Sequence, residues 1–200
     1  MKDINRFITI SNIAIIVLFI CSCENTITKN SDSIKIGIVI NEINYNSSVD
    51  FNPEDWIEIY NPTNETISLG SWEFKDDNDA NVFKFPENMV LVSGGYLVLC
   101  KDTLAFSSLF PNVLSSDIVG NFEFGLGGGG ERIRLFNSDE LLINEVEYDD
   151  ASPWPTEPDG NGPTLELIHP SFDNSSGANW SYSIDNGTPG AENSVYAGER

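Results

Sequence analysis

The chain has 200 residues and a formal net charge of −21, because 31 Asp and Glu residues stand against 10 Lys and Arg residues. Affinity for DNA or RNA depends largely on Lys and Arg displacing counterions from phosphates, so this charge balance argues against a nucleic-acid partner. A single histidine excludes a zinc site built from several imidazoles.

The first 22 residues have the features of a bacterial lipoprotein signal peptide. Two basic residues precede an apolar run at 13–20, which is shorter than the roughly 20 residues that a membrane-spanning helix needs. Residues 20–23, Ile-Cys-Ser-Cys, resemble a lipobox, in which a small residue precedes the modified cysteine. The sequence therefore predicts cleavage before Cys23 and a membrane anchor of acyl chains on Cys23. The alternative is an ordinary signal peptide with two incidental cysteines.

The mature chain is expected to begin with a flexible tether at residues 23–35, which are rich in Asn, Ser, Thr and Asp and have no apolar period. The mature chain would hold 8 basic and 30 acidic residues, a net charge of −22, which indicates a strongly solvated surface. Once Cys23 is acylated, Cys100 has no partner for an intrachain disulfide. Its apolar neighbours predict a buried side chain rather than a nucleophile.

From residue 36 onward, short apolar or alternating runs are separated by turn residues, a pattern typical of β-strands. Within one run, the period of two places Ile57 and Ile59 on one face and Glu58 on the other. If the Glu58 face is wet, the substitution Glu58→Gln should cost little stability. Residues 103–110 are expected to form a short helix or an irregular crossover. The predicted strands are Ile36–Ile43, Trp56–Tyr60, Ile67–Phe74, Val82–Phe85, Tyr96–Cys100, Arg132–Phe136, Leu141–Tyr148 and Thr164–Ile168.

These runs predict one all-β domain, a β-sandwich, over residues 36–193. The pattern gives no sign of a second domain or an internal repeat. Residues 194–200 are expected to form a frayed tail, because the chain after Gly187 is rich in Gly, Pro and Asn.

A glycine-rich segment, Gly125–Gly130, matches the spacing G-x-G-x-x-G of dinucleotide-binding proteins. That site requires the glycines to lie between a strand and a helix, so that the pyrophosphate meets the helix N-terminus. The residues that follow form a strand pattern instead. The segment is therefore interpreted as a flexible turn between two strands.

Two acidic loops are candidates for a calcium site. Asp77, Asp79 and Asn81 have the spacing that begins an EF-hand loop, but the Gly and Glu that should follow are missing. Asp159 lies in a second oxygen-rich loop beside Glu157. Calcium held by Asp77, Asp79 and Asp159 stays an open alternative to plain acidic turns, and no other cofactor is expected.

The remaining chemistry-bearing residues favour structural roles. Glu157 and Asp159 would need to face a cleft to act as a glycosidase pair, and nothing in their pattern indicates one. His169 has no nucleophile elbow elsewhere in the chain to complete a triad. The four tryptophans are spread along the domain, as the core anchors of a sandwich would be. An exposed aromatic platform for sugars is the alternative.

Several short segments together resemble a lamin tail domain of the bacterial type. No segment is specific alone, but their order and combination extend over nearly the whole mature chain. They are Ile40-Asn41-Glu42-Ile43, Trp56 to Pro62, Leu69, Trp72, Pro86, Leu91, Gly94-Gly95-Tyr96, the strand from Gly130 to Leu135, Leu165-Glu166, Trp180 and Thr188-Pro189-Gly190-Ala191 with Asn193. The resemblance implies an immunoglobulin-like β-sandwich and a non-catalytic module, of a kind found on secreted and surface proteins of bacteria.

The sequence as a whole predicts a lipid-anchored, non-catalytic interaction module of the bacterial cell envelope, held at the outer membrane or cell surface through Cys23. Its partner would be a protein or a glycan that the sequence does not identify. A calcium- or glycan-binding adhesin domain is the first alternative. A small hydrolase that uses the acidic loops is the second.

Overall fold

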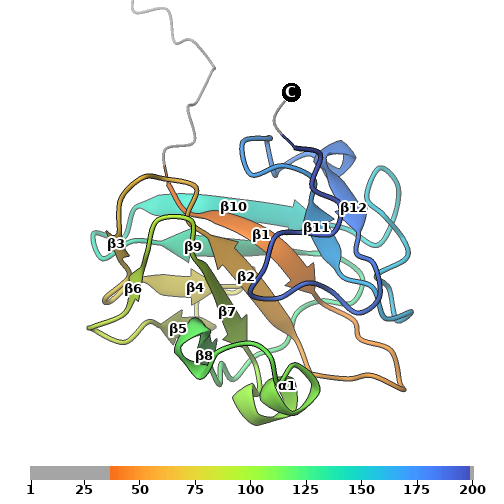
Figure 1. Ribbon diagram of the computed structural model, residues 1–200, viewed down its shortest axis with the longest axis horizontal. Helices are drawn as coiled ribbons and strands as arrows, with labels where there is room; N and C mark the ends of the chain where they lie inside the picture. The colour runs from red at the N-terminus through yellow and green to blue at the C-terminus, as the bar shows by residue number, and fades with distance from the viewer. Residues whose placement is uncertain (1–36, 199–200) are drawn as a thin grey trace, which may run out of the picture. The chain divides into compact units, whose positions relative to one another are not determined.

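Short strands of alternating polarity pair into two sheets that bury a shared apolar core (Figure 1). The computed structural model describes residues 37–198. The predicted signal peptide, Cys23 and the tether lie outside the described residues. No helix in the described part of the chain is long and apolar enough to cross a bilayer.

One sheet has six strands in the order β12-β11-β1-β2-β7-β8. All neighbours are antiparallel except β7 and β8. Parallel neighbours need a crossover, and a short α-helix, α1 (Thr103–Leu109), and a 3₁₀ turn at Ser115–Asp117 lie in that connection. The strands are β1 (Val39–Asn44), β2 (Trp56–Tyr60), β7 (Tyr96–Cys100), β8 (Ile118–Gly120), β11 (Leu165–Leu167) and β12 (Trp180–Tyr182).

The second sheet has four antiparallel strands in the order β10-β9-β4-β5. A two-stranded ribbon of β3 and β6 completes the strand pairing, and a further 3₁₀ turn at Gly177–Asn179 precedes β12. The bounds are β3 (Ile67–Ser68), β4 (Glu73–Lys75), β5 (Val82–Lys84), β6 (Val90–Leu91), β9 (Glu131–Phe136) and β10 (Leu142–Tyr148). The all-β prediction is confirmed, and the fold is consistent with an immunoglobulin-like sandwich.

The core lies between the two sheets. Ile57 and Ile59 of the six-stranded sheet are fully buried in the same cluster as Phe74, Leu135 and Val146 of the four-stranded sheet. Burying an aliphatic side chain of this size contributes about 1.5–3 kcal/mol relative to leaving it exposed. The predicted orientation of both isoleucines is confirmed.

The outer face of the six-stranded sheet is also covered. At one edge α1 packs Phe106 against Trp56, Val98 and Cys100. Further across, the chain that follows β12 runs over β11, β1 and β2 (Figure 1). Glu58 is therefore fully buried, so this face of β2 is not wet and the condition for a small cost of Glu58→Gln is not met. The alternation of residues within a strand does not show whether an element distant in sequence covers its outer face.

This covering chain, residues 187–196, is named the C-terminal strap. The sequence placed the end of the domain at residue 193 and a frayed tail after it. In the structure the Ser194 hydroxyl and the Val195 amide both donate hydrogen bonds to Glu166. The packed chain thus continues past residue 193.

Candidate binding site at the loop end

The C-terminal end of β1 defines one end of the sandwich, here named the loop end. The loops 45–55, 76–81, 121–130 and 149–163 meet there, because the register places Asn44 opposite Trp56 and Tyr148 opposite Glu131. Tyr45 stacks on Tyr148 with ring centroids 4.8 Å apart. This stacking joins the first of these loops to the end of the four-stranded sheet.

Carboxylates dominate the loop end. The four loops contain no basic residue. Lys101, which directly follows β7, lies beside them, and its Nζ pairs with Glu54 at 2.9 Å and Asp55 at 3.8 Å. Two arginines reach the same end from β9. The acidic residues of the loops are Asp50, Glu54, Asp55, Asp76, Asp77, Asp79, Glu123, Asp149, Asp150, Glu157 and Asp159.

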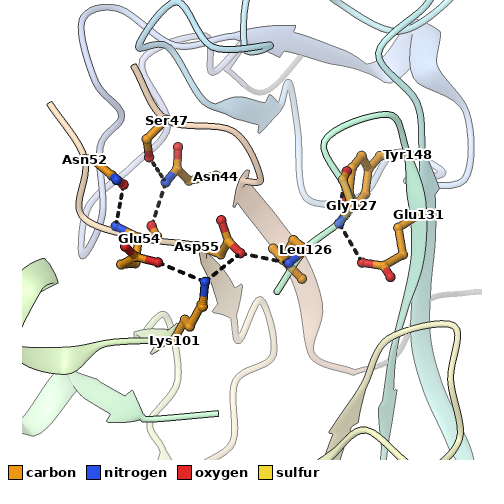
Figure 2. A network of polar contacts seen from close by, with 10 residues as sticks. All are labelled: Asn44, Ser47, Asn52, Glu54, Asp55, Lys101, Leu126, Gly127, Glu131 and Tyr148. Atoms are coloured by element: carbon orange, nitrogen blue, oxygen red, sulfur yellow. Dashed lines mark hydrogen bonds and ion pairs between the residues drawn. The ribbon is translucent and has the colours of Figure 1, made fainter. Parts of the chain in front are cut away.

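The glycine-rich segment is held by carboxylates of its own chain (Figure 2). The Leu126 amide donates to Asp55 Oδ2 at 2.8 Å, and the Gly127 amide donates to Glu131 Oε2 at 2.9 Å. The Tyr148 hydroxyl donates to the Gly127 carbonyl at 3.0 Å. These amides already bind anions, so they do not form a free phosphate cradle. The segment leads into strand β9 rather than a helix, which confirms the prediction of a turn.

Burial and neighbouring negative charges raise the pKa of two carboxyl groups at the loop end. Burial raises the pKa of Asp55, and the Leu126 amide and Lys101 oppose that rise. Burial also raises the pKa of Glu131, and the charges of Asp76, Asp77 and Asp55 raise it further. The loop end therefore has a strongly negative potential, which a cationic ligand would relieve.

An open pocket of about 310 Å³ lies on this end. Four carboxylates and two largely buried aromatic side chains line it. The side chains that line it are Asp77, Glu131, Glu147, Tyr148, Asp149 and Trp154. Such a combination suits a positively charged group, since carboxylates supply charge and an aromatic ring supplies a polarisable face.

The predicted calcium ligands do not come together. Asp77 pairs with Arg132 at 3.2 Å and Asp79 pairs with Arg134 at 2.8 Å. Asp159 accepts a hydrogen bond from Asn46 Nδ2 at 2.6 Å. Over residues 37–198, no group of three or more His, Cys, Asp or Glu side chains is arranged to hold a metal ion. The calcium hypothesis thus has no preformed site in this part of the chain.

The other candidates are structural. Cys100 is fully buried, and burial raises the pKa of its thiol, so its prediction as a core residue is confirmed. The four tryptophans are at most 8% exposed, which confirms their prediction as core anchors. His169 stacks on Tyr196 away from the loop end and contacts Ser171 through Nδ1 at 2.7 Å. Neither Glu157 nor Asp159 lines the acidic pocket.

Sequence reasoning missed the pocket residues Glu131, Glu147 and Asp149. Each lies at or next to the end of a predicted strand, and only the pairing of β9 with β10 brings them together. An alternating strand that ends in consecutive acidic residues, as β10 does before Asp149 and Asp150, is the one local signal that could have indicated them.

Comparison with known proteins identifies the family. The sequence profile of the Lamin Tail Domain family matches residues 32–150, which is more than half of the chain. The chain belongs to the lamin tail domain family. No curated protein matches it. Strands β11 and β12 complete the six-stranded sheet, and the C-terminal strap covers it. All three lie beyond the matched residues.

Among solved structures, this lamin tail domain is similar to a DUF4876 family protein from Bacteroides thetaiotaomicron. The two share 11% sequence identity with a TM-score of 0.44, over 66% of this chain and 62% of the other. The chain thus spans about 62% of the length of that protein.

Proposed function

We propose that this lamin tail domain protein is a lipid-anchored, non-catalytic binding module of the bacterial cell envelope. Its loop end would hold a basic segment of a partner protein. The observation that carries the proposal is the acidic pocket at the loop end, which Glu131, Glu147 and Asp149 line together with Tyr148 and Trp154.

The position of the pocket supports this role. The chain reaches the domain at the start of β1, and the loop end lies at the other end of the same strand. The pocket therefore lies at the end of β1 opposite to the end where the described chain enters the domain. Electrostatic attraction between a negative surface and a basic partner accelerates encounter and favours that class of partner over acidic ones.

The positions of the reactive side chains support a binding role over an enzymatic one. The thiol of Cys100 is buried against Trp56 and Phe106. The imidazole of His169 is engaged by Ser171 and Tyr196. A partner at the loop end would instead need only charge, an aromatic contact and a rigid frame, which the sandwich provides.

The test is a calorimetric titration of the full chain with a Lys- and Arg-rich peptide at several salt concentrations. In one variant the pocket is neutralised by Glu147→Gln with Asp149→Asn. The matched control is Asp139→Asn with Glu140→Gln, which makes the same change of net charge in the β9–β10 hairpin at the opposite end. All four side chains are exposed, so neither variant should disturb folding.

We expect the pocket variant to bind the peptide about tenfold more weakly, which is about 1.4 kcal/mol, while the control loses little. Binding should also weaken as salt rises. Equal losses in the two variants would show that only net charge matters, and that result would overturn the assignment to the loop end.

A further inference from the structure

Three glutamates lie side by side in the middle of the six-stranded sheet. Glu42 on β1 is directly opposite Glu58 on β2 and also directly opposite Glu166 on β11. Directly opposed residues of neighbouring strands have Cβ atoms about 4.5–5.5 Å apart. All three side chains are fully buried. This set is named the glutamate row.

The C-terminal strap covers the row and is hydrogen bonded to each of its members. The Thr188 amide donates to Glu42 Oε1 at 3.0 Å, and the Thr188 hydroxyl donates to Glu166 Oε1 at 2.7 Å. The Gly190 amide donates to Glu58 Oε2 at 2.5 Å. Every one of these donors is neutral, so the strap satisfies hydrogen bonds without cancelling charge.

Among residues 37–198, no positive charge compensates the row. Glu42 faces Glu58 and Glu166, and the strap itself contributes no basic residue, since its ionisable side chains are Glu192 and Tyr196. Further ionisable neighbours are Tyr96 on β7 and Tyr60 on β2, which stack on each other. Burial raises the pKa of Tyr96, and the charges of Tyr60, Glu58, Glu192 and Tyr196 raise it further. The Lys and Arg residues of 37–198 form their ion pairs elsewhere, on the four-stranded sheet and at the loop end.

One oxygen of the row is left without a partner. Glu42 Oε1 accepts from Thr188 and from the Thr164 hydroxyl at 2.5 Å, but Glu42 Oε2 is buried and makes no hydrogen bond. Burying three adjacent carboxylates with no counter-ion is very costly. A proton on Glu42 Oε2 removes one of the three charges and turns this unpaired acceptor into a hydrogen-bond donor.

We propose that the glutamate row is a proton-operated latch that holds the C-terminal strap closed while Glu42 is protonated and releases it when the proton is lost. In the opening step the O–H bond of Glu42 breaks and the proton passes to water. Three adjacent negative charges then repel one another, and hydration of their oxygens requires the strap to leave. The strap and Glu166 lie outside the residues that match the family profile, so the latch extends beyond the matched part of the fold.

The acid–base properties of the row agree with this geometry. Burial raises the pKa of Glu42 well above its ordinary value, and the charges of Glu58 and Glu166 raise it further. Burial raises the pKa of Glu58 to about 8 against the Gly190 and Asn41 hydrogen bonds. The pKa values of Glu42 and Glu58 in the folded chain lie above those in the unfolded chain. The protonated row therefore contributes its full stabilisation at acid pH. It is lost as the pH rises through the folded-state pKa values, which are about 8 for Glu58 and well above the ordinary carboxyl value for Glu42.

The first experiment measures amide hydrogen exchange of the full chain between pH 5 and pH 9, corrected for the intrinsic pH dependence of exchange. If opening requires the loss of one proton, the protection of Thr188, Gly190 and Val195 should fall by up to about tenfold per pH unit between the ordinary carboxyl pKa and the raised pKa of the row, and level off above it. Amides of β7, such as Val98, should stay protected over the same range. Constant protection of the strap, or a parallel loss in β7, would overturn the latch.

The second experiment compares Glu42→Gln with the exposed control Glu145→Gln. The amide keeps an acceptor for Thr188 and places two permanent donors where Oε2 lies, so the strap of Glu42→Gln should stay closed at pH 9. The control should open like the wild type. Equal opening in both variants would refute the role of Glu42.

An infrared spectrum of the wild-type chain at pH 7 covers the case in which Glu42→Gln fails to fold. The row predicts the carbonyl band of a protonated carboxylic acid at neutral pH, which disappears as the strap opens. A spectrum with carboxylate bands alone at pH 7 would show that the row holds no proton, and it would overturn the proposal.

Discussion

Replacing Asn193 by Ala tests how much the C-terminal strap contributes to the stability of the domain. Asn193 Nδ2 donates to the carbonyls of Asn41 and Leu167 at 3.0 and 2.9 Å, and its Oδ1 accepts from Asn41 Nδ2 at 2.8 Å. The Asn41 carbonyl lies at an irregularity in the pairing of β1 with β2. The side chain of Asn193 thus replaces a hydrogen bond that the sheet does not provide.

The size of the effect follows from the groups left behind. Two buried carbonyls lose their donor, at about 1–3 kcal/mol each, whereas Asn41 Nδ2 keeps its bond to Glu58 Oε1 at 3.1 Å. A small pocket of about 50 Å³ is lined by Asn41 and Asn193, which is room enough for a water molecule to replace part of the loss. We therefore expect Asn193→Ala to lower the free energy of unfolding by about 2–3 kcal/mol.

The assay is urea unfolding followed by tryptophan fluorescence, with Glu192→Gln as the control. Glu192 lies in the same strap and is exposed, so its variant should change the free energy of unfolding by less than about 0.5 kcal/mol. A cost for Asn193→Ala no larger than that of the control would show that the strap does not pack as described.

Three further predictions address the core, the helix cap and the anchor. Ile59→Ala should lower the free energy of unfolding by about 2–5 kcal/mol in urea melts, and a smaller loss would contradict its place between the sheets. Asp102 accepts from the amides of Leu104 and Ala105 at the start of α1, so Asp102→Ala should cost about 1 kcal/mol and Asp102→Asn much less; equal costs would refute the cap. Cys23→Ala should abolish incorporation of a palmitate analogue in growing cells while Cys21→Ala retains it, and label on the Cys23→Ala chain would refute the lipobox assignment.

Adding calcium or magnesium distinguishes general charge screening from binding at a specific calcium site. Because residues 37–198 hold no preformed cluster of metal ligands, calcium and magnesium at matched ionic strength should raise the thermal unfolding midpoint by the same small amount through screening. A rise with calcium alone would indicate a site formed by rearrangement of the acidic loops, and it would restore the calcium hypothesis.

The local sequence pattern was sufficient to predict the bounds of the strands that have a clear apolar pattern of their own. Trp56–Tyr60 and Tyr96–Cys100 have the same bounds in the structure as in the prediction. The predicted strand at 67–74 is instead two strands, because a turn at Leu69–Trp72 with a positive φ at Ser71 interrupts it. Strands β6, β8 and β12 are only two or three residues long, which is too short for a period to be recognised.

The candidate sites were harder to predict, because they depend on pairs distant in sequence. Glu42 and Glu166 are separated by 124 positions and meet only through the pairing of β1 with β11. Alternation correctly placed Glu58 opposite the core face. It could not show that α1 and the strap cover that second face. The acidic loops were visible in the composition, but their partners Arg132 and Arg134 lie on a strand about 55 residues further along.

The position of β1 in the sheet has a consequence for the order of folding. This first strand of the domain is flanked by β2 and by β11, and the second partner is synthesised more than a hundred residues later. Contacts between such distant segments make folding slow, and the sheet cannot close around β1 until Leu165–Leu167 has been made. A nascent or truncated chain that lacks this segment keeps an unpaired edge in the middle of its future sheet.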